Sequence, residues 1–182
     1  MNRWKSSAEK LHQTKYLALM AAMIALKTVL SMYYLPVSEN LRVSISFLIV
    51  ALEASIVGPA AGMVSGAVTD LVSFLLFPDG AFFFGYTITA MLGELIYAFF
   101  LYRKKVTWQR LLLSKLLNNY LVNVLLGSLW SSLLYSRGYY WYLAKSAMKN
   151  TILLPFEVLA LAAMFRLLNP VLEKRGWIMK QQ

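Results

Sequence analysis

The sequence predicts an all-α fold, a bundle of six transmembrane helices with both termini in the cytoplasm. Three observations predict it: the apolar composition, six long apolar segments and the placement of the basic residues. Of the 182 residues, 59% are hydrophobic and 14% are charged, and the mean hydropathy is +0.58. Soluble domains are about half apolar and about a quarter charged, so a soluble fold of this length could not bury so many apolar side chains. The lipid bilayer is therefore the expected solvent.

The apolar residues are grouped into segments of the length that a bilayer requires. A membrane-spanning helix needs about 20 predominantly apolar residues. Six segments are candidates: 16–35, 41–57, 60–77, 83–102, 111–135 and 142–168. They are continuous apolar runs without strict alternation, which disfavours an outer-membrane barrel. Only two tails and five short connections remain, so we expect one integral membrane domain over residues 1–182.

The basic residues predict the orientation of the bundle. The net charge is +10, and most Lys and Arg lie in the tail up to Lys15, between Arg103 and Lys115, or from Arg166 onward. With six spans these three regions share one side, which the positive-inside rule places in the cytoplasm. Because the charges flank spans and do not form one patch, nucleic-acid binding is not expected. A cleaved signal peptide is a weaker alternative, because the apolar run continues beyond Lys27.

Missing residue types exclude several kinds of site. The chain has no Cys, and His12, its single His, lies in the polar N-terminal tail. Disulfides, thiolate metal sites and catalysis by Cys or by a membrane-embedded His are therefore excluded. No GxxxxGK[ST] phosphate loop occurs, so any ATP hydrolysis must be carried out by another chain. We expect no cofactor and no metal.

The first and third predicted helices carry small residues at helical spacing. In the first, Ala18, Ala22 and Ala25 fall within about 40° of one another at 100° per residue, and Lys27 points to the opposite side. Such a stripe allows another helix to approach closely, within the bundle or from outside it. The third helix repeats glycine from Gly58, which favours close packing inside the bundle. Asp70 follows these glycines and requires a partner, for which we consider one of the remaining lysines.

Polar residues in the fifth and sixth predicted helices suggest a ligand site. Asn119, Asn123 and Trp130 lie on one face of the fifth helix. Amides in lipid require hydrogen-bond partners, so they either join helices or bind the edge of a flat heteroaromatic ligand beneath Trp130. Lys145 and Lys149 share one face of the sixth helix, where they either reach the outer interface or bind an anion. The outer half therefore suits a ligand with a planar polar ring and an anionic end.

Five short motifs, in order, resemble one family. They are Ala18-Leu-Met-Ala-Ala22, Gly58-Pro59-Ala-Ala-Gly62, Phe77-Pro78-Asp79-Gly80, Ser128-Leu-Trp130-Ser-Ser-Leu-Leu-Tyr135 and Lys149-Asn150-Thr-Ile-Leu-Leu-Pro155. With six spans and about this length, the chain resembles the substrate-binding S components of energy-coupling factor transporters, and most closely the folate-specific ones. The similarity covers residues 17–168, essentially the whole hydrophobic part.

The resemblance implies a function in vitamin uptake. S components bind a vitamin in a cavity closed by outer loops, dock to a membrane coupling protein that carries two ATPases, and topple to release the vitamin in the cytoplasm. S components dock through a face of small residues on the first helix. The resemblance implies that Ala18 and Ala22 form this face here, and Ala25 extends it. The implied location is the bacterial plasma membrane.

For a folate ligand, chemistry suggests the contacts. The glutamyl carboxylates suit Lys149, Lys145 and Arg42, although Arg42 is equally explained as a solvated loop residue. The pterin edge suits Asp79 or Asp70 together with Asn123. Its rings suit stacking on Trp130 or Tyr34.

Other readings of the sequence remain open. An S component for riboflavin or thiamine is the nearest, although the net basic outer half disfavours a cationic vitamin. An intramembrane enzyme is disfavoured by the missing Cys and membrane His. A membrane scaffold would need no converging polar face.

Overall fold

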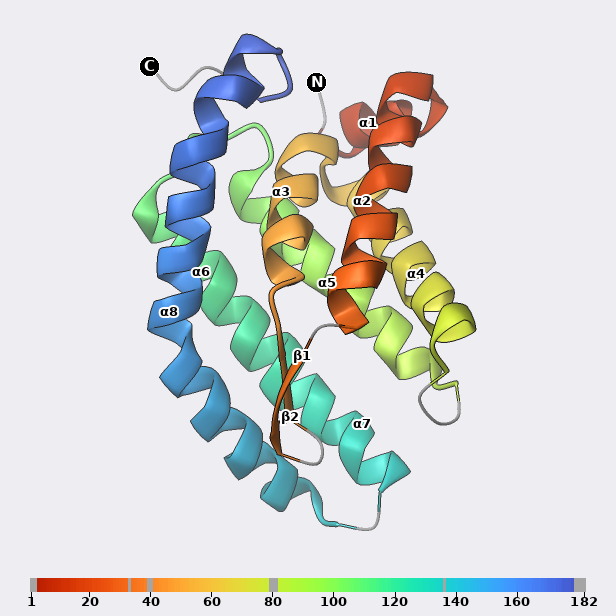
Figure 1. Ribbon diagram of the computed structural model, residues 1–182, viewed down its shortest axis with the longest axis vertical. Coiled ribbons are helices and arrows are strands. Elements are labelled where there is room, and N and C mark those ends of the chain that lie inside the picture. Colours follow the sequence, from red (N-terminus) through yellow and green to blue (C-terminus); the bar gives the residue numbers. More distant parts are fainter. Residues whose placement is uncertain (1–2, 33, 39–40, 79–81, 136, 179–182) are drawn as a thin grey trace.

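The computed structural model describes residues 3–32, 34–38, 41–78, 82–135 and 137–178, with the side chains of Met32 and of both strands left undescribed. It is a bundle of helices whose two chain ends lie at the same end of the molecule (Figure 1). The all-α class predicted from the sequence is confirmed, with one small hairpin as an addition. Which side of the membrane the termini face stays a prediction.

The chain begins with two short helices and one long helix. A hairpin follows, and the remaining bundle helices come after it. Their bounds are α1 Arg3–Ala8, η1 Glu9–His12, α2 Thr14–Met32, β1 Tyr34–Ser38, β2 Leu41–Ser44, α3 Phe47–Val57, α4 Pro59–Leu76, α5 Phe84–Leu101, α6 Trp108–Leu117, η2 Asn118–Leu126, α7 Gly127–Leu134 and α8 Tyr139–Lys174. Among the described residues, α2, α4, α5 and α8 are long and apolar enough to cross a membrane, and α3 is a shorter apolar helix. Helix α6, the π-helical segment η2 and α7 form one continuous rod (Figure 1).

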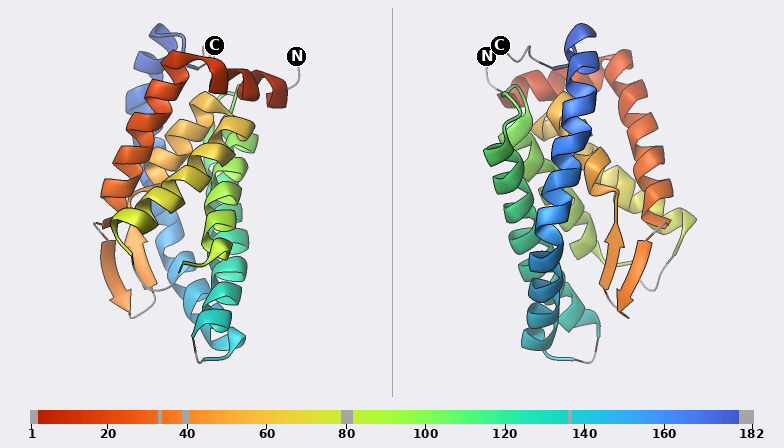
Figure 2. Two further views of the ribbon diagram at one scale, coloured as in Figure 1. Left: turned by 90° about the vertical axis from the view of Figure 1, so that its right-hand side faces the viewer. Right: turned by 60° about the vertical axis from the view of Figure 1, so that its left-hand side comes forward.

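The β-hairpin corrects the predicted bounds of the first two spans. The segments 16–35 and 41–57 were expected to be helical throughout, but α2 ends at Met32 and α3 begins only at Phe47. Between them β1 and β2 pair antiparallel, with Leu35 opposite Val43 and Pro36 opposite Arg42. Pro36 lacks a backbone N–H and disfavours helix in the residue before it, so a two-stranded edge suits this stretch better than a helix. The hairpin extends toward the end of the bundle where α7 and α8 meet (Figures 1 and 2).

Glycines set the close contacts of α4. Gly58 ends α3 with a φ of +86°, and Pro59 begins α4 at its first turn, the positions where these residues are favoured. A Cβ on Gly66 would lie 2.8 Å from the Ala90 carbonyl oxygen of α5. The interpretation of this glycine repeat as close packing inside the bundle is therefore confirmed.

A buried ion cluster joins four helices. Lys27 of α2 lies 2.7 Å from a carboxylate oxygen of Glu53 on α3 and 2.7 Å from one of Glu94 on α5. The side chains are 2%, 0% and 1% exposed, respectively. Ser65 of α4 donates to Glu53 and accepts from Lys27 at 3.1 Å. Buried charges require such partners, so this cluster explains why a lysine stands within the first apolar segment.

Candidate ligand-binding site

A large cavity opens between the helices in the half of the bundle away from the chain ends. Its volume is about 1000 Å³. It is lined by the last turn of α2, the first residues of α3, the second half of α4, much of α5, the end of α6, the rod of η2 and α7, and the first half of α8. Sites for small molecules enclose about 300–1,000 Å³, so this cavity accommodates a ligand of vitamin size.

One wall of the cavity is a network of amides between η2 and α8. Asn123 donates to the side-chain oxygens of Asn119 at 3.3 Å and Asn150 at 3.4 Å. Asn150 in turn donates to the Ser146 carbonyl at 2.8 Å, and the Ser146 hydroxyl donates to the Asn123 carbonyl at 3.2 Å. The network joins helices, which was one of the two open interpretations of these amides. Asn123 and Asn150 also line the cavity, and contact with a ligand stays a prediction.

The π-helical form of η2 places these amides. A π-helix pairs residue i with residue i+5 and so widens the turn, and such segments occur frequently at functional sites. Here Asn118, Val122 and Asn123 line the cavity, while Asn119 is buried and donates to Glu157 of α8 at 2.7 Å.

Three lysines line the cavity. Lys145 and Lys149 come from successive turns of α8, and Lys115 comes from α6. The amino group of Lys145 also lies 4.6 Å from the centre of the Trp141 ring. Lysines at a cavity wall supply charge for an anionic ligand group.

Lys115 corrects an interpretation of the sequence. It was counted among the basic residues that set the orientation, yet it is only 3% exposed and its amino group lies 3.1 Å from Glu157 on α8. It also lies 3.9 Å from the centre of the Phe47 ring. Lys115 is therefore an internal ion-pair partner at the cavity wall. The long sequence separation from Glu157 left no local signal for this pairing.

Two buried hydroxyls on the lining lack a partner. Among the described residues, neither the Tyr97 hydroxyl on α5 nor the Ser128 hydroxyl on α7 has a hydrogen-bond partner, although both are buried. Buried polar groups are nearly always hydrogen-bonded in native proteins. These two groups therefore suit a polar ligand atom, and sequence reasoning missed both because a lone Tyr or Ser in an apolar run carries no signal.

The structure brings together four of the eight predicted ligand-binding residues. Asp70, Asn123, Lys145 and Lys149 all line the cavity. The partner of Asp70 is Thr87 on α5, which donates to it at 2.6 Å, and not the lysine that the sequence suggested.

Of the other four predicted residues, the structure describes the side chain of Trp130 only. Trp130 packs against Phe83, with ring centres 5.4 Å apart, and is absent from the cavity wall. Tyr34 and Arg42 lie on β1 and β2, whose side chains are not described. Asp79 lies outside the described residues. Their roles stay predictions.

The alanine stripe is exposed on the flank of the bundle. Ala18, Ala22 and Ala25 are all exposed on α2, whereas Lys27 on the same helix is buried. The prediction that the alanine stripe and Lys27 point to opposite sides of this helix is therefore confirmed.

Comparison with known proteins assigns the family. The family model for the substrate-specific component of ECF transporters, that is, energy-coupling factor transporters, matches residues 15–172. The chain is an ECF transporter S component. This S component is thus a multi-pass membrane protein of a transporter family, as the resemblance of its motifs suggested.

Relatives of this S component include named folate transporters. It is 28% identical over 150 residues to the folate transporter FolT of Clostridium novyi (strain NT), covering 82% of this chain and 87% of the relative. It is 32% identical over 152 residues to FolT of Leuconostoc mesenteroides, covering 80% of this chain and 81% of the relative. A crystal structure of FolT bound with folic acid matches with a TM-score of 0.76 and 36% identity, covering 82% of this chain and 91% of that one.

Proposed function

We propose that this S component is the high-affinity folate-binding subunit of an ATP-driven vitamin importer in the bacterial plasma membrane. It captures folate in the cavity from the outer face. It then docks to a membrane coupling protein with two ATPases and topples to release folate in the cytoplasm.

One observation carries the proposal. A cavity of about 1000 Å³ lined by lysines, amides and aromatic rings occurs in a chain whose fold matches that of a folate-bound FolT at 36% identity. Folate has a flat, polar pterin ring, an aromatic middle and an anionic glutamyl end. These three parts require amides or carboxylates, apolar walls and cations, and the cavity offers all three.

The cations of α8 suit the glutamyl carboxylates. Lys145 and Lys149 lie one turn apart, so two carboxylates on a flexible chain can contact them together. Lys115 is paired with Glu157 at 3.1 Å. Arg42, on the hairpin, stays a candidate for the same end of the ligand.

The other polar groups suit the pterin ring. A pterin edge carries N–H donors and acceptors, which match the Asp70 carboxylate and the Asn123 amide, respectively. The unpartnered hydroxyls of Tyr97 and Ser128 provide two further contacts. Phe47 and Tyr86 on the lining are aromatic surfaces for stacking, beside the earlier candidates Trp130 and Tyr34. Asp79 stays an alternative to Asp70.

A titration tests the ligand. The purified chain in detergent is titrated with folate while tryptophan fluorescence is followed, with thiamine and riboflavin as controls. We expect saturable quenching by folate alone. We expect Lys149→Ala to weaken binding at least tenfold, about 1.4 kcal/mol, because a cation next to the glutamyl carboxylates is lost.

A matched variant controls for general charge loss. Lys174→Ala removes a lysine at the end of α8 far from the cavity and should leave the folate affinity unchanged. Wild-type affinity in Lys149→Ala would refute the carboxylate assignment. A response to thiamine or riboflavin in place of folate would assign the cavity to another vitamin.

Docking is tested on the exposed face of α2. Ala22→Trp places a large ring on a surface that the coupling protein must approach closely, so folate binding should persist while uptake by cells with the complete transporter is abolished. Ala163→Trp, at an exposed alanine of α8, is the control and should leave both intact. If uptake survived Ala22→Trp, the alanine face would be ordinary lipid-facing surface.

A further inference from the structure

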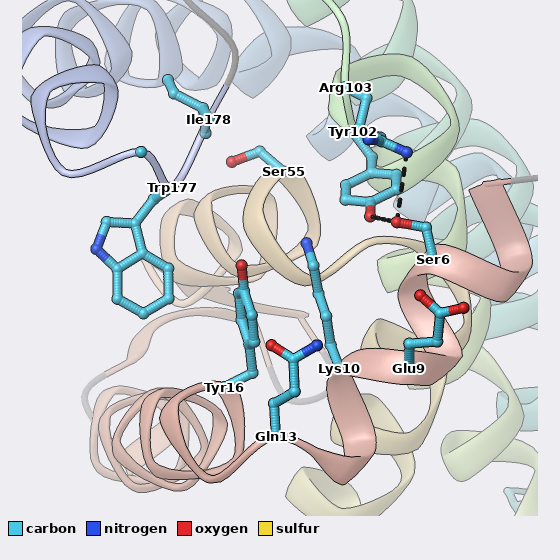
Figure 3. A pocket seen from close by; sticks show the side chains of 11 residues that line it. Ser6, Glu9, Lys10, Gln13, Tyr16, Ser55, Tyr102, Arg103, Trp177 and Ile178 are labelled. Carbon is cyan, nitrogen blue, oxygen red and sulfur yellow. Dashed lines mark hydrogen bonds between the residues drawn. The ribbon is translucent and has the colours of Figure 1, made fainter. Parts of the chain in front are cut away.

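A second, smaller cavity lies at the opposite end of the bundle from the ligand site. Its volume is about 360 Å³, and it is lined by η1, the end of α5 and the C-terminal turn after α8, among others. Figure 3 shows Lys10, Arg103, Tyr102, Tyr16 and Trp177 around it. Nothing in the proposed folate mechanism uses these residues.

Two cations at this cavity lack a carboxylate partner. Among the described residues neither Lys10 nor Arg103 forms a salt bridge. Lys10 donates to the Ile56 carbonyl and lies over the rings of Tyr16 and Tyr102, 4.7 and 4.6 Å from their centres. An ammonium has three donors, so its bond to Ile56 leaves capacity for an anion.

The electrostatics of the cavity favour an anion. Burial and, as a smaller cause, the nearby Arg103 together lower the pKa of Lys10 to about 8. Glu9 also lines the cavity, so the two cations face one carboxylate there. An anion next to Lys10 would stabilise an ammonium that burial and Arg103 now disfavour.

Arg103 is held in a disfavoured backbone conformation. Its φ is +53°, and among the described residues it is the one non-glycine with positive φ. Glycine or asparagine adopts this conformation at lower cost. The Arg103 guanidinium nevertheless lies at the cavity, where it donates a hydrogen bond to the Ser6 hydroxyl of α1 at 3.3 Å. The Ser6 and Tyr102 hydroxyls share a further hydrogen bond of 3.1 Å (Figure 3). Strain of this kind is concentrated at functional sites.

The surroundings of the cavity are those of a membrane interface. Helix α1 lies across the end of the bundle (Figure 2), held there by Ser7, which donates to the Val57 carbonyl at 2.8 Å. Trp4 of α1 is exposed, and Lys15 lies 4.0 Å from the centre of the Trp177 ring. Tryptophan and basic residues together are typical of the headgroup level of a bilayer, where basic pockets between helices bind anionic lipid headgroups.

We propose that the cavity between η1, the end of α5 and the C-terminal turn binds the phosphate of an anionic phospholipid headgroup through Lys10 and Arg103. The hydroxyls of Ser6 and Tyr102 border the same space and suit the remaining phosphate oxygens. This site is separate from the folate cavity, and the proposal does not depend on which vitamin the protein carries.

Native mass spectrometry of the full chain in detergent tests this proposal. The delipidated protein receives phosphatidylglycerol or phosphatidylcholine, and the bound lipid is counted. We expect one saturable phosphatidylglycerol and much weaker retention of phosphatidylcholine. Lys10→Gln and Arg103→Gln should each weaken phosphatidylglycerol binding at least tenfold.

Two further variants guard against misfolding and diffuse charge effects. Glu9→Gln removes the carboxylate from the cavity, so it should tighten phosphatidylglycerol binding, whereas a damaged fold would weaken it. Lys5→Gln removes an exposed charge of α1 outside the cavity and should change binding less than twofold. Equal retention of both lipids, unchanged binding in Lys10→Gln and Arg103→Gln, or equal losses in all lysine variants would overturn the proposal.

Inorganic phosphate separates the two sources of the ligand. If millimolar phosphate displaces phosphatidylglycerol from the wild type but has no further effect in Lys10→Gln, the site binds the phosphate group itself, whether free or on a lipid. If phosphate does not compete, the lipid-borne phosphate is the ligand. In both cases the loss of phosphatidylglycerol binding in Lys10→Gln decides whether Lys10 binds the phosphate group.

Discussion

Replacing Lys27 by methionine tests the buried ion cluster. The amino group of Lys27 lies 2.7 Å from both Glu53 and Glu94, and all three side chains are almost completely buried. Methionine has a similar length without the charge, so the two carboxylates would lose their shared cation. Ser65 would remain as a single hydroxyl donor to Glu53.

The expected loss follows from the burial of the cluster. Removing one partner of a buried ion pair costs about 3–5 kcal/mol. At roughly 2–4 °C per kcal/mol for a chain of this size, the melting temperature should fall by about 6–20 °C. Thermal unfolding of the purified chain in detergent, followed by tryptophan fluorescence, measures this shift.

Two controls separate charge from packing. Lys15→Met removes an exposed lysine of the same helix and should melt within about 2 °C of the wild type. The triple variant Lys27→Met, Glu53→Gln and Glu94→Gln should recover most of the loss, because a neutral cluster leaves no buried charge unpaired. A melting temperature within about 2 °C of wild type for Lys27→Met would refute the reasoning.

Two further outcomes are expected. Gly66→Ala should destabilise the bundle by about 1–3 kcal/mol in the same melting assay, because its Cβ would lie 2.8 Å from a backbone carbonyl of α5. Gly138→Ala should leave the stability unchanged, because no atom lies within 4 Å of its Cβ. Equal effects of the two substitutions would contradict close packing as the cause. Phosphatidylglycerol retention should stay constant below pH 8 and fall as the pH rises above 8. Burial and Arg103 lower the pKa of Lys10 from an ordinary value of 10.5 to about 8. Deprotonation of Lys10 above this pH removes the charge that binds the anion. In Lys10→Gln this pH dependence should disappear, and its persistence would assign the titration to another group.

Features with a local or periodic signal were predicted from the sequence. The apolar runs specified the long helices, since lipid requires about 20 apolar residues in a row. The gap between segments 41–57 and 60–77 coincides with the break between α3 and α4 at Gly58-Pro59, where each residue is favoured for a steric reason. The exposed alanines and the buried lysine of α2 followed from a spacing of 100° per residue.

Features that depend on distant contacts were not predicted. Glu53, Glu94 and Glu157 lie far apart in the sequence, yet the fold pairs the first two with Lys27 and the third with Lys115. Such pairings depend on which helix faces come together, and no spacing within one helix encodes that. For the same reason Asp70 was assigned to a lysine, whereas Thr87 on the neighbouring helix is its partner.

The aromatic side of the site shows how local geometry changes a helical face. Asn119, Asn123 and Trp130 share a face only if every residue turns by 100°. The π-helical segment Asn118–Leu126 has more residues per turn, so the phase of the rod shifts before Trp130 is reached. Asn123 therefore lines the cavity, while Trp130 packs against Phe83 beside it.

The ion cluster and the alanine face are linked through α2. Among the side chains of α2 that the structure describes, only Met20, Lys27 and Thr28 are buried, and Tyr16, Leu19 and Met23 are partly buried against the core. Lys27 adds a buried ionic attachment to these apolar contacts, on the side of the helix opposite the exposed alanines. From this it follows that Ala22→Trp and Lys27→Met should fail differently. The first blocks docking on an intact protein, whereas the second loosens the helix that carries the docking face, so uptake and thermal stability should fall together.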